Sequence, residues 1–324
     1  MRIPDEKLTE AVAFLTALRA ELAKVVTGQP GASQEVLIAL IAGGHVLIEG
    51  VPGLGKTLLV KALARTFDGE FSRIQFTPDL MPADVVGHTL FDAATNRFIT
   101  RRGPVFAHLL LADEINRAPA KTQSALLEAM QEGQVTLEGK AQMLPSPFMV
   151  LATQNPIEHE GTYPLPEAQL DRFLLKILIG YPNTEDERAM TRLVTFERAA
   201  QWLDVEAITP LAKPATIIAL QRLAAYVEVD QRVLEYAVSI VRATRDLPAF
   251  VAGAGPRGSI ALVRAARARA LLAGRNFATP DDIRAVALPA LRHRVVTSAE
   301  TEIEGVSVDT VLLTLLDQVA APRT

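Results

Sequence analysis

The sequence predicts an α/β core followed by a C-terminal all-helical domain. Over the first two-thirds of the chain, short apolar runs alternate with helical patterns, as in a parallel sheet that has helices on both faces. Two segments break this alternation, because each contains a strand, a polar turn and a second strand. After Pro182 the strand signal fades and apolar residues recur at helical spacing. We therefore divide the chain into a core, residues 1–182, and a helical domain, residues 183–324.

Five apolar runs are expected to form the parallel sheet. In chain order they are His45–Glu49, Arg73–Phe76, Leu109–Ala112, Phe148–Thr153 and Leu174–Gly180. Helical patterns occupy the intervals, for example at Thr57–Thr66 and Thr122–Gln131. The two exceptional segments are Thr89–Arg101, with its turn at 94–96, and Gln134–Leu144, with its turn at 138–140. We interpret both as β-hairpins inserted into the core.

The second domain is expected to consist of helices alone. Their expected bounds are Glu185–Gln201, Pro214–Tyr226, Gln231–Arg245, Gly258–Ala273 and Pro280–Leu291. The start of the last helix is marked most clearly, because Thr279 can cap it while Pro280 takes the first helical position.

Composition excludes several classes of protein. The net charge of -4 argues against a surface that is basic throughout and binds nucleic acid. The absence of cysteine excludes disulfides, thiol catalysis and thiolate metal sites. The most apolar stretch, Val36–Ile48, is too short to cross a bilayer, so we expect a cytoplasmic protein without a membrane span. A basic run in the second domain is interpreted as a solvated helix face, and it comprises Arg264, Arg267, Arg269 and Arg275.

A glycine-rich loop predicts a nucleotide site. Residues 50–57, GVPGLGKT, match G-x-x-x-x-G-K-[ST], and they follow an apolar strand and open a helix, as the motif requires. Glycines let backbone N–H groups turn toward phosphates, and the helix N-terminus adds the positive end of its dipole. Lys56 is expected to reach the terminal phosphates, and the Thr57 hydroxyl to bind Mg²⁺. The candidate contacts of ATP or ADP are Gly50, Val51, Pro52, Gly53, Leu54, Gly55, Lys56, Thr57 and Leu58.

Two acids end the third predicted strand. Asp113 is assigned to Mg²⁺, because a carboxylate beside the phosphate loop can hold the metal through its water shell. Glu114 follows directly and is assigned to the deprotonation of the attacking water. Acids are also common at solvated strand ends, but the phosphate loop favours the catalytic interpretation.

Five further stretches resemble the MoxR family of AAA+ ATPases. They are Arg73–Asp84, Leu111–Pro119, Ala152–Pro156, Leu165–Phe173 and Gly253–Arg257. With the phosphate loop they extend the resemblance over nearly the whole chain. The resemblance implies an AAA+ P-loop NTPase core with a helical lid, and a nucleotide bound between the two domains.

The resemblance also implies roles for single residues. Asn155 resembles the first sensor, which faces the γ-phosphate and the attacking water, although Asn-Pro also forms turns. Arg172 resembles the arginine finger that reaches a neighbouring subunit's nucleotide, and a surface pair with Asp171 is the alternative. Arg257 resembles the second sensor, and an ordinary exposed arginine is the alternative. The positions that match the family's adenine contacts are Val26, Gly28 and Gln29.

One departure from the family concerns the segment around Arg257. The family has a serine before Pro-Arg and an alanine after it, whereas this chain has Gly255 and Gly258. Because glycine is conformationally permissive, we expect this loop to be more flexible than in relatives.

The function implied by the resemblance is Mg²⁺-dependent ATP hydrolysis in a homo-oligomeric ring, a hexamer. Such a ring would serve chaperone-like maturation or activation of a client protein, together with a partner that carries a von Willebrand factor A domain. The hairpins lack aromatic residues interleaved for base stacking, so we expect them to line a pore or contact a client. Three alternatives stay open: a nucleic-acid motor, which the charge disfavours; a chelatase motor subunit; and a scaffold that binds ATP without turnover, against which Glu114 argues.

Overall fold

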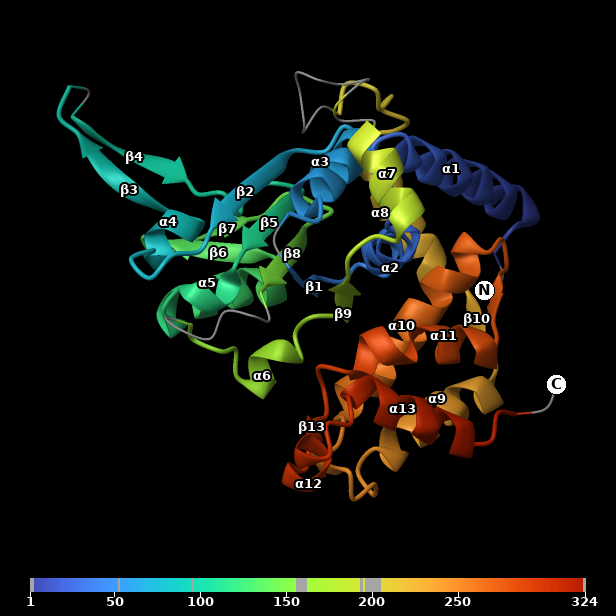
Figure 1. The fold of residues 1–324 in the computed structure, drawn as a ribbon. Coiled ribbons are helices and arrows are strands. Elements are labelled where there is room, and N and C mark those ends of the chain that lie inside the picture. Colours follow the sequence, from blue (N-terminus) through green and yellow to red (C-terminus); the bar gives the residue numbers. More distant parts are fainter. Residues whose placement is uncertain are drawn as a thin grey trace.

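The computed structural model describes residues 3–51, 53–94, 96–155, 162–192, 195 and 205–322. One parallel sheet organises the chain between β1 and β9, with the strand order β2–β5–β8–β1–β9 (Figure 1). Its strands are β1 (Val46–Gly50), β2 (Phe71–Gln75), β5 (Leu109–Asp113), β8 (Met149–Gln154) and β9 (Leu175–Ile179). The five predicted strands are therefore confirmed, with ends displaced by one or two residues at most.

Burial on both faces explains why these strands read as continuous apolar runs. Successive side chains of a strand point to opposite faces, so Val46 and Ile48 pack into one hydrophobic cluster and Leu47 into another. The first cluster includes residues of α1 (Asp5–Ala23), α2 (Pro30–Ile41) and α3 (Lys56–Thr66), and the second includes residues of α4 (Pro82–Val86) and α5 (Ala120–Glu132). Helices thus cover both faces of the sheet, as predicted.

Both inserted hairpins are confirmed. β3 (Gly87–Asp92) pairs with β4 (Arg97–Arg102), and this hairpin projects from the body of the molecule (Figure 1). β6 (Gln134–Leu137) pairs with β7 (Lys140–Met143). On the first hairpin, Phe91 and Phe98 are exposed and meet edge to face, with ring centroids 5.3 Å apart. This exposed pair corrects the expectation that the hairpins lack interleaved aromatic residues.

Helices dominate the rest of the chain. They are α6 (Glu167–Leu170), α7 (Thr184–Arg192), α8 (Pro214–Ala225), α9 (Gln231–Ala243), α10 (Pro256–Leu272), α11 (Pro280–Leu291), α12 (Ala299–Ile303) and α13 (Val308–Gln318). The predicted continuation of α7 to Gln201 lies, apart from Thr195, outside the described residues. Helix α10 begins at Pro256, so Arg257 lies inside its first turn and not ahead of the helix.

Two short strand pairs interrupt the helices of the second part. β10 (Glu228–Val229) pairs with β12 (Phe277–Ala278), and β11 (Phe250–Ala252) pairs with β13 (Val296–Thr297). The sequence did not predict them, because strands of two or three residues carry no readable alternation. Among the described residues, no helix combines the length and the apolar character that a bilayer crossing requires.

Two arginines of the basic run, one in α10 and one just after it, serve packing within the second part of the chain. Arg269 and Arg275 both pair with Asp282, whose side chain is fully buried. The interpretation as a solvated helix face is therefore wrong for these two arginines, since a buried carboxylate neutralises them. Helix α10 also packs against α1 and α2, and one hydrophobic cluster joins these helices. The domain boundary at residue 182 stays a prediction.

Candidate nucleotide-binding site

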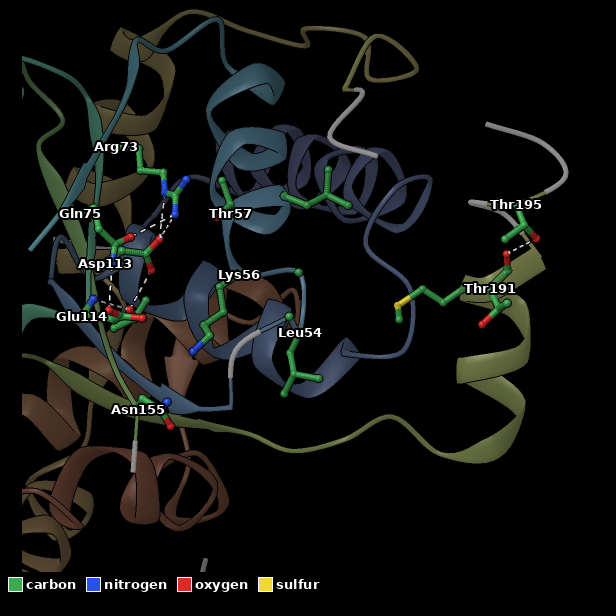
Figure 2. A pocket seen from close by; sticks show the side chains of 15 residues that line it. Leu54, Lys56, Thr57, Arg73, Gln75, Asp113, Glu114, Asn155, Thr191 and Thr195 are labelled. Carbon is green, nitrogen blue, oxygen red and sulfur yellow. Dashed lines mark hydrogen bonds and ion pairs between the residues drawn. The ribbon is translucent and has the colours of Figure 1, made fainter. Parts of the chain in front are cut away.

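A cavity of about 590 Å³ lies at the carboxyl ends of β1, β5 and β8 (Figure 2). Its volume is within the range of about 300–1,000 Å³ that is typical of small-molecule sites. It is lined by Gly53–Leu58 of the phosphate loop, by Asp113 and Glu114, and by Asn155, while α7 contributes Met190. Ligands of open α/β sheets bind at this edge, because the carboxyl ends of parallel strands meet there.

The loop between β1 and α3 has the backbone geometry that its glycines predict. Gly53 and Gly55 have φ angles of 86° and 75°, a region that residues with a Cβ rarely adopt. At Gly50, a Cβ would lie 2.5 Å from the carbonyl oxygen of Ile179, so β9 leaves no room for a side chain. The loop therefore depends on glycine at these positions. Pro52, a predicted contact, lies outside the described residues.

Lys56 opens α3, and its ammonium folds back onto the loop. Its Nζ donates a hydrogen bond to the carbonyl oxygen of Gly50 at 2.6 Å. Partial burial lowers the pKa of Lys56, and the charges of Asp113 and Glu114 act in the opposite direction. A cation inside a glycine-rich loop is the arrangement that neutralises bound phosphates.

A single buried hydroxyl fixes both acids. Thr153, on β8, donates from Oγ1 to Oδ1 of Asp113 at 2.8 Å and accepts the backbone N–H of Glu114 at 2.9 Å. The other oxygen of Asp113, Oδ2, accepts from Nε of Arg73 on β2 at 2.9 Å. Neither Thr153 nor Arg73 was predicted from the sequence as a site residue. Only the strand order could have identified them, because β2 and β8 lie on either side of β5, the strand that ends in Asp113.

Glu114 is held in a backbone conformation that non-glycine residues rarely adopt. Its φ of 55° is left-handed, so the chain turns sharply at the end of β5 into the 3-10 helix η1 (Ile115–Arg117). Nε2 of Gln75 donates to Oε2 of Glu114 at 2.8 Å, and Nε of Arg117 lies 2.9 Å from the same oxygen. These two contacts orient a carboxylate that lines the cavity.

Asn155 follows β8 directly and lines the same cavity as Lys56 and Glu114 (Figure 2). The residue is 9% exposed, so the surrounding protein restricts its position. The structure thus brings together the predicted phosphate loop, the acid pair and the predicted first sensor.

The predicted adenine contacts are not among the described residues that line the cavity. Nε2 of Gln29 donates to the carbonyl oxygen of Leu54 at 2.9 Å, which ties the start of α2 to the phosphate loop. Gly28 lies against Asp186 of α7, and Val26 packs against the first hydrophobic cluster. Their assignment to adenine stays a prediction.

Arg172 and Arg257 line a different cavity, of about 410 Å³, together with Arg264 and Arg294. Nη1 of Arg172 donates to the carbonyl oxygen of Leu127 at 2.9 Å. The predicted site residues therefore gather in two places. The phosphate loop, the acids and Asn155 share one cavity, and the two arginines share the other.

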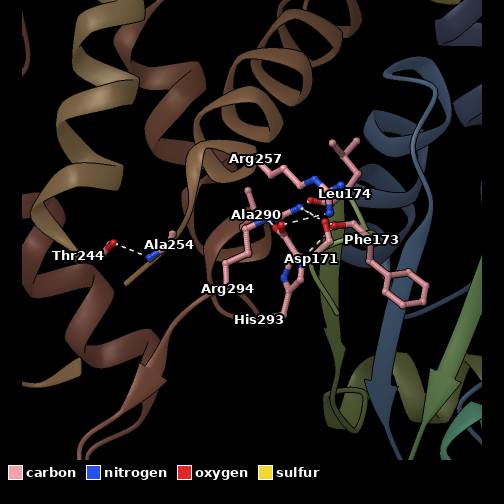
Figure 3. A network of polar contacts seen from close by, with 9 residues as sticks. All are labelled: Asp171, Phe173, Leu174, Thr244, Ala254, Arg257, Ala290, His293 and Arg294. Carbon is pink, nitrogen blue, oxygen red and sulfur yellow. Dashed lines mark hydrogen bonds and ion pairs between the residues drawn. The ribbon is translucent and has the colours of Figure 1, made fainter. Parts of the chain in front are cut away.

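Asp171 joins the core to the second part of the chain (Figure 3). Its Oδ1 accepts from Nε of Arg294 at 2.8 Å, and its Oδ2 lies 3.6 Å from Nη1 of Arg257. The alternative of a surface pair between Asp171 and Arg172 is therefore wrong, because the carboxylate faces residues of the second part.

Arg294 anchors the segment that precedes β9. Its side chain is 3% exposed and donates to the carbonyl oxygens of Phe173 and Leu174 at 2.6 and 3.1 Å (Figure 3). Burial lowers the pKa of Arg294, and the charge of Asp171 raises it. A buried guanidinium with a carboxylate and several carbonyl partners fixes the position of the chain next to Arg172.

The donor set of the first cavity fits a magnesium nucleotide. Thr57 and Asp113 offer hydroxyl and carboxylate oxygens, the hard ligands that Mg²⁺ prefers. Within the described part of the chain, no group of three or more histidine, cysteine or acidic side chains could hold a metal by itself. A magnesium ion at this place would take its other ligands from phosphates and water, as it usually does.

Comparison with known proteins decides the family. Residues 45–175 match the family described as "ATPase family associated with various cellular activities (AAA)", and residues 242–313 match the "AAA lid domain". The chain is 46% identical over 299 residues to the uncharacterized protein YeaC of Bacillus subtilis, covering 92% of each chain. It is 46% identical over 314 residues to the chaperone MoxR1 of Mycobacterium tuberculosis, covering 94% of this chain and 81% of MoxR1. The chain belongs to the MoxR family of AAA+ ATPases.

The fold agrees with this membership in the MoxR family. The crystal structure of a protein from Cytophaga hutchinsonii, assigned as an ATPase, superposes with a TM-score of 0.90 and 40% identity over 98% of both chains. In this MoxR-family chain, Gly258 lies inside α10, where an added Cβ would lie 3.2 Å from Cδ2 of Leu291. The expected flexibility is therefore wrong at Gly258, which allows α10 to pack closely on α11.

Proposed function

We propose that this chain hydrolyses ATP with Mg²⁺. The observation that carries the proposal is the convergence of the phosphate loop, the acid pair and Asn155 on one cavity. Thr57 and Asp113 would hold Mg²⁺, which would supply charge stabilisation of the phosphates. Glu114 would accept a proton from the attacking water, and Asn155 would orient that water.

We also propose that the active form is a ring of identical subunits, a hexamer. Arg172 and Arg257 line a cavity other than the one beside their own phosphate loop, so they would serve the nucleotide of a neighbouring subunit. An arginine supplied in this way offsets the charge that develops on phosphate and is worth roughly 10³–10⁵ in rate. Arg294, through Asp171, would hold both arginines on one face.

The work of the ring is proposed to be chaperone-like maturation or activation of a client protein. The support is 46% identity to a relative named as a chaperone. The exposed pair Phe91 and Phe98, on a projecting hairpin, offers an apolar surface to a client. A partner protein that carries a von Willebrand factor A domain would work together with the ring. The lid would begin at residue 183 and move against the core.

Glu114→Gln tests the catalytic part of this proposal. The variant should bind ATP as the wild type does, while turnover falls about a hundredfold or more, the usual contribution of a general base. Glu132→Gln, an exposed site on α5, is the matched control and should keep normal turnover. Normal turnover by Glu114→Gln would remove this residue from the mechanism.

Mixing two inactive variants tests the ring. Arg172→Ala lacks the finger and Glu114→Gln lacks the base, so some interfaces in a mixed ring pair an intact finger with an intact base. We expect the mixture to regain part of the wild-type turnover. If mixed oligomers form, as mass spectrometry can verify, and turnover stays absent, Arg172 does not act between subunits.

A further inference from the structure

Arg73 is a second cation, besides Lys56, that lines the cavity containing the phosphate loop. The proposed mechanism gives Arg73 no role. It lies on β2 two residues before Gln75, so the two side chains point to the same face of the strand. β2 pairs in parallel with β5, with Gln75 opposite Asp113. Arg73 therefore reaches along the sheet edge toward Asp113, and it lines the cavity as Lys56 does (Figure 2).

The guanidinium of Arg73 contacts only one of the two carboxylate oxygens of Asp113, Oδ2. Nε and Nη2 lie 2.9 and 2.8 Å from Oδ2, while Oδ1 accepts the hydroxyl of Thr153 at 2.8 Å. Oδ1 is thus engaged by a neutral group, and Oδ2 is the oxygen available to a cation. Arg73 therefore contacts the same oxygen, Oδ2, that would accept hydrogen bonds from the water shell of a metal ion.

The two partners differ in how firmly they are held. The side chain of Asp113 is 14% exposed and fixed by Thr153, whereas that of Arg73 is 49% exposed. Nη2 of Arg73 also donates to Oε1 of Gln75, at a longer 3.2 Å. A half-exposed arginine can leave a carboxylate at small cost, because exposed ion pairs are weak.

We propose that Arg73 is the resting counter-ion of Asp113, which releases Oδ2 when a magnesium nucleotide binds and neutralises phosphate charge when a nucleotide binds without metal. This inference rests on the proposed nucleotide function. Two cations that share one carboxylate weaken each other's binding, and this coupling is reciprocal. The released guanidinium keeps five N–H donors, which match phosphate oxygens well.

The test is the dependence of nucleotide binding on metal. The dissociation constant of a fluorescent ADP derivative is measured with MgCl₂ and with EDTA, and the EDTA value is divided by the MgCl₂ value. Arg73→Gln should raise this ratio about threefold or more, because loss of an exposed ion pair changes an equilibrium constant about two- to fivefold. The ratio rises for two reasons. Nucleotide binding without metal weakens, and Arg73 no longer competes with the metal for Oδ2 of Asp113.

Two further variants separate charge from general perturbation. Arg73→Lys keeps a cation and should give a ratio near that of the wild type. Arg65→Gln removes an exposed arginine in the last turn of α3 that does not line the cavity, so its ratio should also match the wild type. Circular dichroism confirms that each variant is folded.

The outcomes distinguish this inference from the proposed function. An unchanged or smaller ratio in Arg73→Gln overturns the inference, and so does an equal rise in Arg65→Gln. If the wild type binds no nucleotide even with MgCl₂, the proposed function fails and this inference fails with it. Normal binding with an unchanged ratio removes the inference alone.

Discussion

Thr153→Val removes the one hydroxyl that holds both acids of the candidate site. The side chain is 1% exposed, and its oxygen lies 2.8 Å from Oδ1 of Asp113 and 2.9 Å from the nitrogen of Glu114. Valine keeps the branched shape, so the loss is confined to two hydrogen bonds. A bond to a charged group contributes about 1.5–3 kcal/mol and a neutral one about 0.5–1.5 kcal/mol. We expect the free energy of unfolding to fall by about 2–4 kcal/mol.

Thr122→Val is the matched control for this change. Thr122 is also 1% exposed, but its hydroxyl donates to a single neutral acceptor, the carbonyl oxygen of Leu80 at 2.7 Å. Its loss should cost about 1 kcal/mol. Urea denaturation measures both values, and an ATPase assay should show turnover of Thr153→Val reduced about tenfold or more, because the acids lose their alignment. Equal costs and normal turnover would refute the role given to Thr153.

The remaining predictions concern stability. Arg294→Met should lower the free energy of unfolding by about 3–5 kcal/mol, since it leaves buried acceptors without a donor, whereas Arg257→Met, at a side chain that is 56% exposed, should cost about 1 kcal/mol or less. Equal costs in urea denaturation would show that Arg294 is not the anchor. Burial raises the pKa of Glu35 from 4.5 to about 7, against the opposing charge of Arg292. The folded state therefore keeps a proton that the unfolded chain releases, and stability falls as pH rises from 4.5 to about 7. Glu35→Gln should be more stable than the wild type by about 3 kcal/mol at pH 8 and equal to it near pH 4; stability curves that run parallel across this range would contradict the prediction.

Local patterns predicted the parts of the site that one segment encodes. The phosphate loop is read from eight consecutive residues, and its glycines have the expected geometry. The predicted cap at Thr279 is confirmed as a capping box with Asp282. The position of Arg257 inside α10 was also readable, because Pro256 fits a first helical position. The predicted start of that helix was two residues late.

Contacts between distant segments could not be read from the sequence. Thr153 and Asp113 are 40 residues apart, and Gln75 and Glu114 are 39 apart. No local spacing marks such pairs, which meet only because the sheet places β2, β5 and β8 side by side. The contact of Asp171 with Arg294 could not be predicted either, because 123 residues separate them and no local spacing marks the pair. Asp113 and Glu114 were predicted as site residues, but their partners Thr153 and Gln75 read as ordinary polar side chains until the strand order is known.

Calorimetric titration of ATP into the wild type and Lys56→Ala, with Mg²⁺ present, tests the central claim that the loop from Gly50 to Thr57 holds a triphosphate. The ammonium of Lys56 lies within that loop, 2.6 Å from the carbonyl oxygen of Gly50. We predict saturable uptake of nucleotide by the wild type. Lys56→Ala should bind at least about tenfold more weakly, because a charged hydrogen bond contributes about 1.5–3 kcal/mol. No heat of binding from folded wild-type protein, or equal affinity in the two proteins, would contradict the claim.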